Sequence, residues 1–98
     1  MTITKTRDGA TLTLALTGRL DAVSAAELGQ QVEALEADIT KLVLDFAGVE
    51  YISSAGLRII LLAQKKMNRQ GVMLLRHVGE PVMEVFTMTG FSDILVIE

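Results

Sequence analysis

Four consecutive small residues, Ser53-Ser54-Ala55-Gly56, offer the clearest opportunity for chemistry in this sequence. They follow a short apolar run and precede Leu57, where apolar residues begin to recur at helical spacing. Serine is preferred at the start of a helix, because its oxygen accepts hydrogen bonds from backbone amides that lack partners. The same free amides and the helix dipole favour a negative charge such as a phosphate. Ser54 therefore suits a structural cap, and the bare helix start around it is also a favourable place for a phosphate.

The residues after Ser54 favour a helix end that other molecules can approach. Gly56 would lie in the first helical turn, where glycine is less favourable than alanine by roughly 1 kcal/mol. Small side chains at these positions would leave the helix start bare. Arg58 follows Ser54 by four residues, which is within helical reach of a phosphate on the serine.

Catalysis has little support elsewhere in the chain. His77 is the only histidine, cysteine is absent, and no second histidine is available to complete a metal site. Asp45 lies inside an apolar run, and we interpret it as a structural hydrogen-bond acceptor. The chain contains no phosphate-binding loop, dinucleotide fingerprint or nucleophile elbow. The sequence thus predicts no catalytic residue, no metal site and no cofactor.

Length and composition predict a single domain spanning residues 1–98 with an aliphatic core. Half of the 98 residues are hydrophobic and only 4% are aromatic. The net charge of -3 lacks the basic footprint of a nucleic-acid-binding protein. The first residues lack the apolar stretch of a signal peptide, and no apolar run approaches the length of a membrane span. We therefore expect a cytoplasmic protein.

The first half of the chain predicts a hairpin, a helix and a buried strand. Asp8-Gly9 favours a tight turn between two alternating strands. Ser24 and Glu27 are spaced as a capping box. The apolar residues that follow recur at the spacing of a helical stripe. The expected elements are strands at 1–7 and 11–16, a break at Gly18, a helix from 24 to about 38, a strand at 42–46, and a connection at 47–52 broken by Gly48.

The second half predicts two further helices and two strands. A helix from 53–56 should end before Gly71, and Gly90 should end the next helix. Pro81 suits a first helical turn. The remaining expected elements are strands at 72–77 and 94–97 and a helix at 82–89. This order predicts an α/β fold with a mixed sheet. An N-terminal antiparallel hairpin would be followed by β-α-β units, with helices packed mainly on one face.

Several segments resemble those of STAS domains, the fold of the anti-sigma factor antagonists. Leu16-Thr17-Gly18-Arg19-Leu20-Asp21 resembles the L-x-G-x-L-D segment of that family. Three further segments of this chain resemble the strand, the loop and the D-S-[ST]-G-L segment of the family. They are Val43-Leu44-Asp45-Phe46, then Val49 with Tyr51-Ile52, and then Ser53-Ser54-Ala55-Gly56-Leu57. The order of elements and the length also agree, so the resemblance covers nearly the whole chain.

The resemblance implies a phosphorylation-switched binding module. In bacterial members the serine two places before the glycine is phosphorylated, and this serine corresponds to Ser54. The unphosphorylated form would bind a GHKL-type serine kinase that is also the anti-sigma factor, and would thereby free a sigma factor. A PP2C-type phosphatase would reverse the modification. No direct contact with nucleic acid or membrane is implied.

The resemblance also assigns roles to residues around Ser54. The contact surface would comprise Ser53, Ser54, Gly56 and Arg58, with the loop at Asp21 beside them. Asp45 is expected to orient the loop that leads to Ser54, by accepting backbone or hydroxyl hydrogens.

Two residues depart from the family pattern. Ser53 stands where many members have aspartate, and Ala55 where many have serine or threonine. Ser53 is therefore a rival to Ser54, both as phosphate acceptor and as helix cap. The alternative function is that of a STAS subunit without a switch, held in a larger assembly such as a lipid-transport ABC complex. A small-ligand or nucleotide binder would need phosphate contacts that this sequence lacks.

Overall fold

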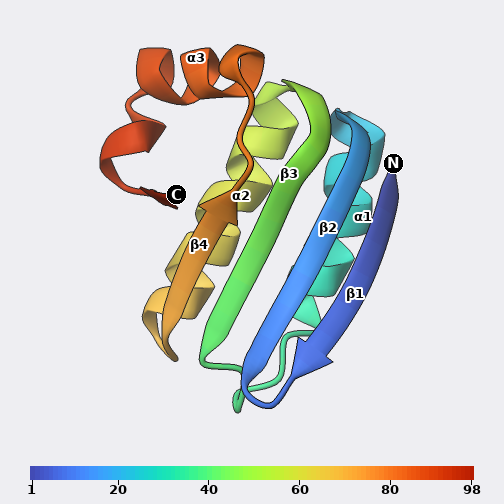
Figure 1. Cartoon of the computed structure of the whole chain (residues 1–98), viewed down its shortest axis with the longest axis vertical. Coiled ribbons are helices and arrows are strands. Elements are labelled where there is room, and N and C mark those ends of the chain that lie inside the picture. The colour runs from blue at the N-terminus through green and yellow to red at the C-terminus, as the bar shows by residue number, and fades with distance from the viewer.

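A five-stranded mixed sheet forms the frame of the molecule in the computed structural model, which describes residues 1–98 (Figure 1). Its strands follow one another across the sheet in chain order. The first pair is antiparallel, and every later pair is parallel. The strands are β1 (Thr2–Asp8), β2 (Thr11–Leu20), β3 (Lys41–Ile52), β4 (Val72–Arg76) and β5 (Val96–Ile97).

Two helices cover one face of this sheet. Helix α1 (Ala22–Glu33) connects β2 to β3, and α2 (Ser54–Asn68) connects β3 to β4. Figure 1 shows both behind the sheet, whereas α3 (Glu80–Thr89) lies beyond the end of the sheet near the start of α2. A short 3₁₀ turn, η1 (Phe91–Asp93), precedes β5. The predicted α/β fold, with an N-terminal hairpin and helices mainly on one face, is confirmed.

Buried apolar residues alternate with more exposed residues along the strands, and the buried ones form the aliphatic core. The inward residues of β2 and β3 are at most 6% exposed, whereas the alternate residues of β2 are half-buried or exposed on the face that carries no helix. The aromatic contribution comes mainly from Phe46 and Phe86, which pack edge to face with ring centroids 6.1 Å apart. The principal core residues are Leu12, Leu14, Leu16, Leu42, Leu44 and Phe46 from the sheet and Leu28, Val32, Ile60, Ala63 and Met67 from the helices.

Both long strands continue past the glycines that were predicted to end them. Strand β2 passes Gly18 and β3 passes Gly48, so the predicted connection at 47–52 is wrong. A Cβ at Gly48 would lie 2.9 Å from the Thr17 Oγ1 and 3.0 Å from the Leu16 carbonyl oxygen. Gly18 has a φ of 115° beside a shift in the strand register. These glycines therefore permit a close, irregular strand pairing and do not break it.

Two helix boundaries also have causes that differ from those predicted. Asp21, and not Ser24, is the N-cap of α1, and Ser24 occupies the third helical position of that capping box. Gly71 lacks the left-handed conformation of a helix-ending glycine; a Cβ there would collide with the Thr40 backbone. Gly90, with φ of 80°, does end α3 as predicted.

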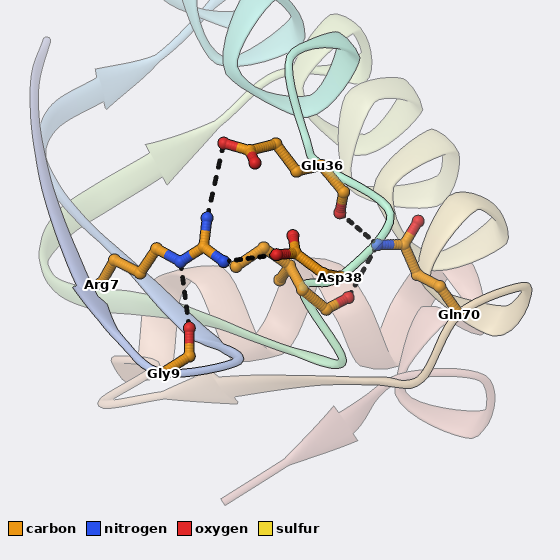
Figure 2. A network of polar contacts seen from close by, with 6 residues as sticks. Arg7, Gly9, Glu36, Asp38 and Gln70 are labelled. Carbon is orange, nitrogen blue, oxygen red and sulfur yellow. Dashed lines mark hydrogen bonds and ion pairs between the residues drawn. The ribbon is translucent and has the colours of Figure 1, made fainter.

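A polar network closes the end of the molecule opposite to the start of α2 (Figure 2). Arg7 donates to the Gly9 carbonyl at 3.0 Å and to Asp38 at 2.9 Å, and its guanidinium lies 3.4 Å from Glu36. The side-chain amide of Gln70 donates to the Glu36 and Ile39 carbonyl oxygens at 2.8 and 2.7 Å. The network joins the hairpin, the α1–β3 connection and the end of α2.

Candidate functional site

Parallel pairing brings the starts of α1 and α2 to the same edge of the sheet. Leu20 and Ile52 are register partners at the ends of β2 and β3, and each precedes a helix cap. The Ser53 amide donates to the Leu20 carbonyl oxygen at 2.9 Å, which fixes the two junctions together. The predicted proximity of the Asp21 loop to the Ser53–Ser54 segment therefore follows directly from the sheet.

The two neighbouring serines have different environments. Ser53 is the half-buried N-cap of α2, and its oxygen accepts a hydrogen bond of 3.2 Å from the Gly56 amide. Ser54 is the first residue of the helix, is exposed, and makes no side-chain hydrogen bond. The prediction that α2 begins at 53–56 with Ser54 in its first turn is confirmed, and the cap is Ser53.

Gly56 belongs to the packing of the site and not to its surface. The residue is buried, and a Cβ there would lie 2.8 Å from side-chain carbons of both Leu20 and Ile52. The same Cβ would lie 3.0 Å from the Leu20 carbonyl oxygen. The prediction that Gly56 offers contact surface is therefore wrong, because its missing side chain lets α2 approach the end of β2.

Arg58 is exposed and lies one turn after Ser54 on α2. It makes no ion pair, and the first turn of α2 contains no acidic residue. On α2 itself, the helix start and this guanidinium both contribute positive charge on the side of the Ser54 hydroxyl. That Arg58 reaches a phosphate on Ser54 stays a prediction.

A stacked pair that the sequence did not indicate extends this surface. The Arg19 guanidinium carbon lies 4.0 Å from the centroid of the Tyr51 ring. The two residues are register partners one position before Leu20 and Ile52, and this pairing depends on the strand extensions that were not predicted. Tyr51 is 41% exposed, and Val23 in the first turn of α1 is 73% exposed. The edge therefore presents apolar area together with the free serine.

Asp21 shapes the adjoining loop through short-range hydrogen bonds. Its Oδ1 accepts from the Val23 and Ser24 amides, each at 3.1 Å, and these donors lower the pKa of the carboxyl, the Ser24 amide most. The buried Ser24 hydroxyl donates to the Arg19 carbonyl at 2.6 Å and accepts from the Asp21 amide at 2.8 Å. Asp21 is thus rigidly held beside the exposed edge.

Asp45 is a hydrogen-bond acceptor, as predicted, and it lies within the strand that leads to Ser53 and Ser54. Its Oδ1 accepts from the Ala47 amide at 3.0 Å and lies 3.0 Å from the His77 Nδ1. The Ala47 amide, followed by His77, lowers the pKa of the Asp45 carboxyl. The loop it was expected to orient is part of β3, so Asp45 instead ties the middle of β3 to the left-handed His77 after β4.

The site is thus a preorganised surface around a free hydroxyl at a helix start. The chain contains no group of three or more histidine, cysteine or acidic residues arranged to hold a metal ion. None of its helices is both long enough and apolar enough to cross a bilayer. Fold and site together define a small mixed-sheet module that presents an exposed serine.

Comparison with known proteins identifies the family. A family model described as "Mlab, STAS domain" matches residues 3–97. The chain therefore belongs to the STAS domain family.

One curated relative is BtrV of Bordetella bronchiseptica, which carries the name anti-sigma factor antagonist. It is 43% identical over 70 residues, which are 70% of this chain. The matched region spans 58% of the length of that relative.

Solved structures share the fold at lower identity. An anti-sigma factor antagonist from Mycobacterium paratuberculosis superimposes with a TM-score of 0.86 at 24% identity, covering 98% of this chain and 83% of that one. SpoIIAA of Bacillus in its phosphorylated form gives a TM-score of 0.78 at 15% identity, covering 99% and 91%. These two likenesses concern the fold.

Proposed function

We propose that this protein is an anti-sigma factor antagonist controlled by phosphorylation of Ser54. In its unphosphorylated form it binds an anti-sigma factor that is also a GHKL-type serine kinase, and a sigma factor is released. A PP2C-type phosphatase restores the unphosphorylated form. The protein acts in the cytoplasm as a binding module and as a kinase substrate, and it is not itself an enzyme.

The separation of roles between the two serines carries this proposal. Ser53 caps α2, whereas the Ser54 hydroxyl is exposed and makes no hydrogen bond. A phosphate on Ser53 would disturb the cap, because its oxygen already accepts from the Gly56 amide. A phosphate on Ser54 leaves that hydrogen bond intact. Ser54 is therefore the better acceptor of the two.

The charge of the phosphate favours a switch in binding without a change in fold. A phosphoserine adds roughly -1.5 to -2 charges and three acceptor oxygens. At the start of α2 this charge meets free amides and Arg58, so the folded chain tolerates it. A partner surface that fits the neutral hydroxyl would have to bury a dianion without matched donors, which is costly. Affinity for the kinase should fall by about tenfold or more, since roughly 1.4 kcal/mol corresponds to a factor of ten.

Calorimetry with the cognate kinase tests the proposal. Ser54→Ala should bind as the wild type does and remain unphosphorylated in intact-mass measurements. Ser54→Asp should melt at the wild-type temperature and bind weakly. The matched control is Ser53→Ala, which removes the neighbouring hydroxyl and should still be phosphorylated. Equal affinities for the wild type and Ser54→Asp, or phosphorylation of Ser54→Ala on Ser53, would refute the assignment.

A second candidate is a permanent STAS subunit of a larger assembly, such as a lipid-transport ABC complex. The observation that favours it is the description of the matched family model, which names Mlab and not an antagonist. In that case the surface around Ser54 would serve constant docking. Co-purification with an ATPase subunit, unchanged in Ser54→Asp, would support this candidate over the switch.

A further inference from the structure

Helix α2 concentrates positive charge in an acidic protein. Four of the nine Lys and Arg residues fall between Arg58 and Arg69, while the chain as a whole has a net charge of -3. The Lys66 ammonium is already engaged, since it donates to the Val32 and Glu33 carbonyl oxygens at 2.9 and 3.1 Å. Lys65 and Arg69, by contrast, are exposed and form no ion pair.

These two cations border a groove between α1 and α2. The groove has a volume of about 420 Å³, and its apolar wall consists of Val32, Ile59 and Leu62. Its charged lining is Lys65, Lys66 and Arg69 against the single carboxylate of Glu33, so positive charge prevails. Leu62 is 48% exposed although it lies on the wall of a concave site. Gly29 keeps the groove open, because a Cβ at this position would lie 3.3 Å from the Ile59 Cδ1. The groove therefore suits a helix that carries both apolar side chains and carboxylates.

Helix α3 of this same protein has that character. Met88 is 85% exposed, the largest exposed fraction among the large apolar residues. Glu80 and Glu84 are exposed one turn apart and form no ion pair. Met83 and Thr87 lie on the same outer side of α3 as these residues. The helix thus presents an acidic, methionine-bearing face without a partner.

Helix α3 cannot occupy the α1–α2 groove of its own molecule. Helix α3 packs on β3 and η1 and lies beyond the end of the sheet where α2 begins (Figure 1). Lys65 and Arg69 lie at the other end of α2. We infer that α3 of one copy docks into the α1–α2 groove of a second copy. The inference is independent of the proposed function, because neither surface includes Ser54.

The contact should be weak and sensitive to salt. The net negative charge of each copy opposes association, and salt weakens the attraction between exposed charges, with a Debye length of about 10 Å at 0.1 M ionic strength. Apolar contact of Met88 with Leu62 adds a contribution that salt does not remove. The two surfaces differ, so each contact is heterologous, and chains longer than a dimer are allowed.

Sedimentation velocity over a concentration series at low and high salt tests this inference. We expect the average mass of the wild type to rise with concentration, and to rise less at high salt. The groove variant Lys65→Glu with Arg69→Glu, and the α3 variant Glu80→Lys with Glu84→Lys, should each associate about tenfold more weakly than the wild type. An equimolar mixture of the two variants should associate again, because each reversed surface then meets an opposite charge.

A matched control separates local contacts from net charge. Lys5→Glu with Lys41→Glu alters the net charge as much as the groove variant does, at two residues that form no ion pair. This control should associate more strongly than the groove variant. Thermal melts check that every variant is folded.

Three results would overturn the inference. The wild type could remain monomeric at low salt up to its solubility limit. The mixture of the two reversed variants could fail to associate although the wild type does. Lastly, a monomeric wild type that binds phosphatidylglycerol vesicles through Lys65 and Arg69 would assign the groove to a membrane surface.

Discussion

Replacing Gly56 by alanine should destabilise the protein although the residue lies in a helix. Alanine is favoured over glycine in helices by about 1 kcal/mol. The new methyl group, however, would lie 2.8 Å from carbons of Leu20 and Ile52 and 3.0 Å from the Leu20 carbonyl oxygen. Overpacking of this kind costs about 1–3 kcal/mol, and the backbone contact places this case in the upper part of that range. We expect a net loss of roughly 1–2 kcal/mol.

Gly29→Ala provides the matched control for this prediction. This glycine also lies in a helix, but its added methyl group would meet only the Ile59 Cδ1, at 3.3 Å, and that atom is the mobile end of a side chain. The control should gain about 0.5–1 kcal/mol. Urea unfolding followed by circular dichroism measures both, and each kcal/mol corresponds to about 4–8 °C in Tm for a domain of this size. A Gly56→Ala variant as stable as the wild type would show that the α2–β2 junction is not tightly packed.

Two further predictions concern the same edge and the neighbouring strand. Ser53→Ala should lose about 1 kcal/mol of unfolding free energy, because the α2 cap is removed. Ser54→Ala should change the unfolding free energy by less than about 0.5 kcal/mol. Equal losses for the two variants in urea unfolding would contradict the assigned roles. The pKa of Asp45 is lowered in the folded state, so its contribution to stability is complete above the unfolded value of about 3.9 and is lost as the pH falls through the folded value. Asp45→Asn should therefore lower stability at neutral pH and flatten its decline in acid, and parallel acid unfolding curves for variant and wild type would exclude this role.

Local patterns predicted the elements of the fold well because their causes are local. The Asp8-Gly9 hairpin, the start of α2 and the Gly90 stop of α3 all depend on neighbouring residues. The prediction at Gly48 was wrong because glycine is needed there for contact with another strand, β2, and not for a turn. It faces Thr17 across the β2–β3 pairing, and a sequence does not reveal which glycine breaks an element and which permits close approach.

The site was predictable in position but not in detail. Ser54 could be placed at a helix start from capping chemistry alone. The burial of Gly56 against Leu20 and the stacking of Arg19 on Tyr51 depend on the register of two parallel strands. The same is true of the link between Asp45 and His77, which are 32 residues apart. Such pairs arise only from the assembled sheet.

The sequential order of the strands has a consequence for folding during synthesis. Each strand pairs with the one made immediately before it, so no strand must wait for a distant later segment. Chains emerge from the ribosome N-terminal end first, at roughly 5–20 residues per second. The hairpin can therefore form first and provide the edge for β3, and α2 can cover one face of the sheet while the edge of β3 stays open for β4. Helix α3 would dock next, when Phe86 meets a Phe46 that is already in place, and β5 would complete the sheet.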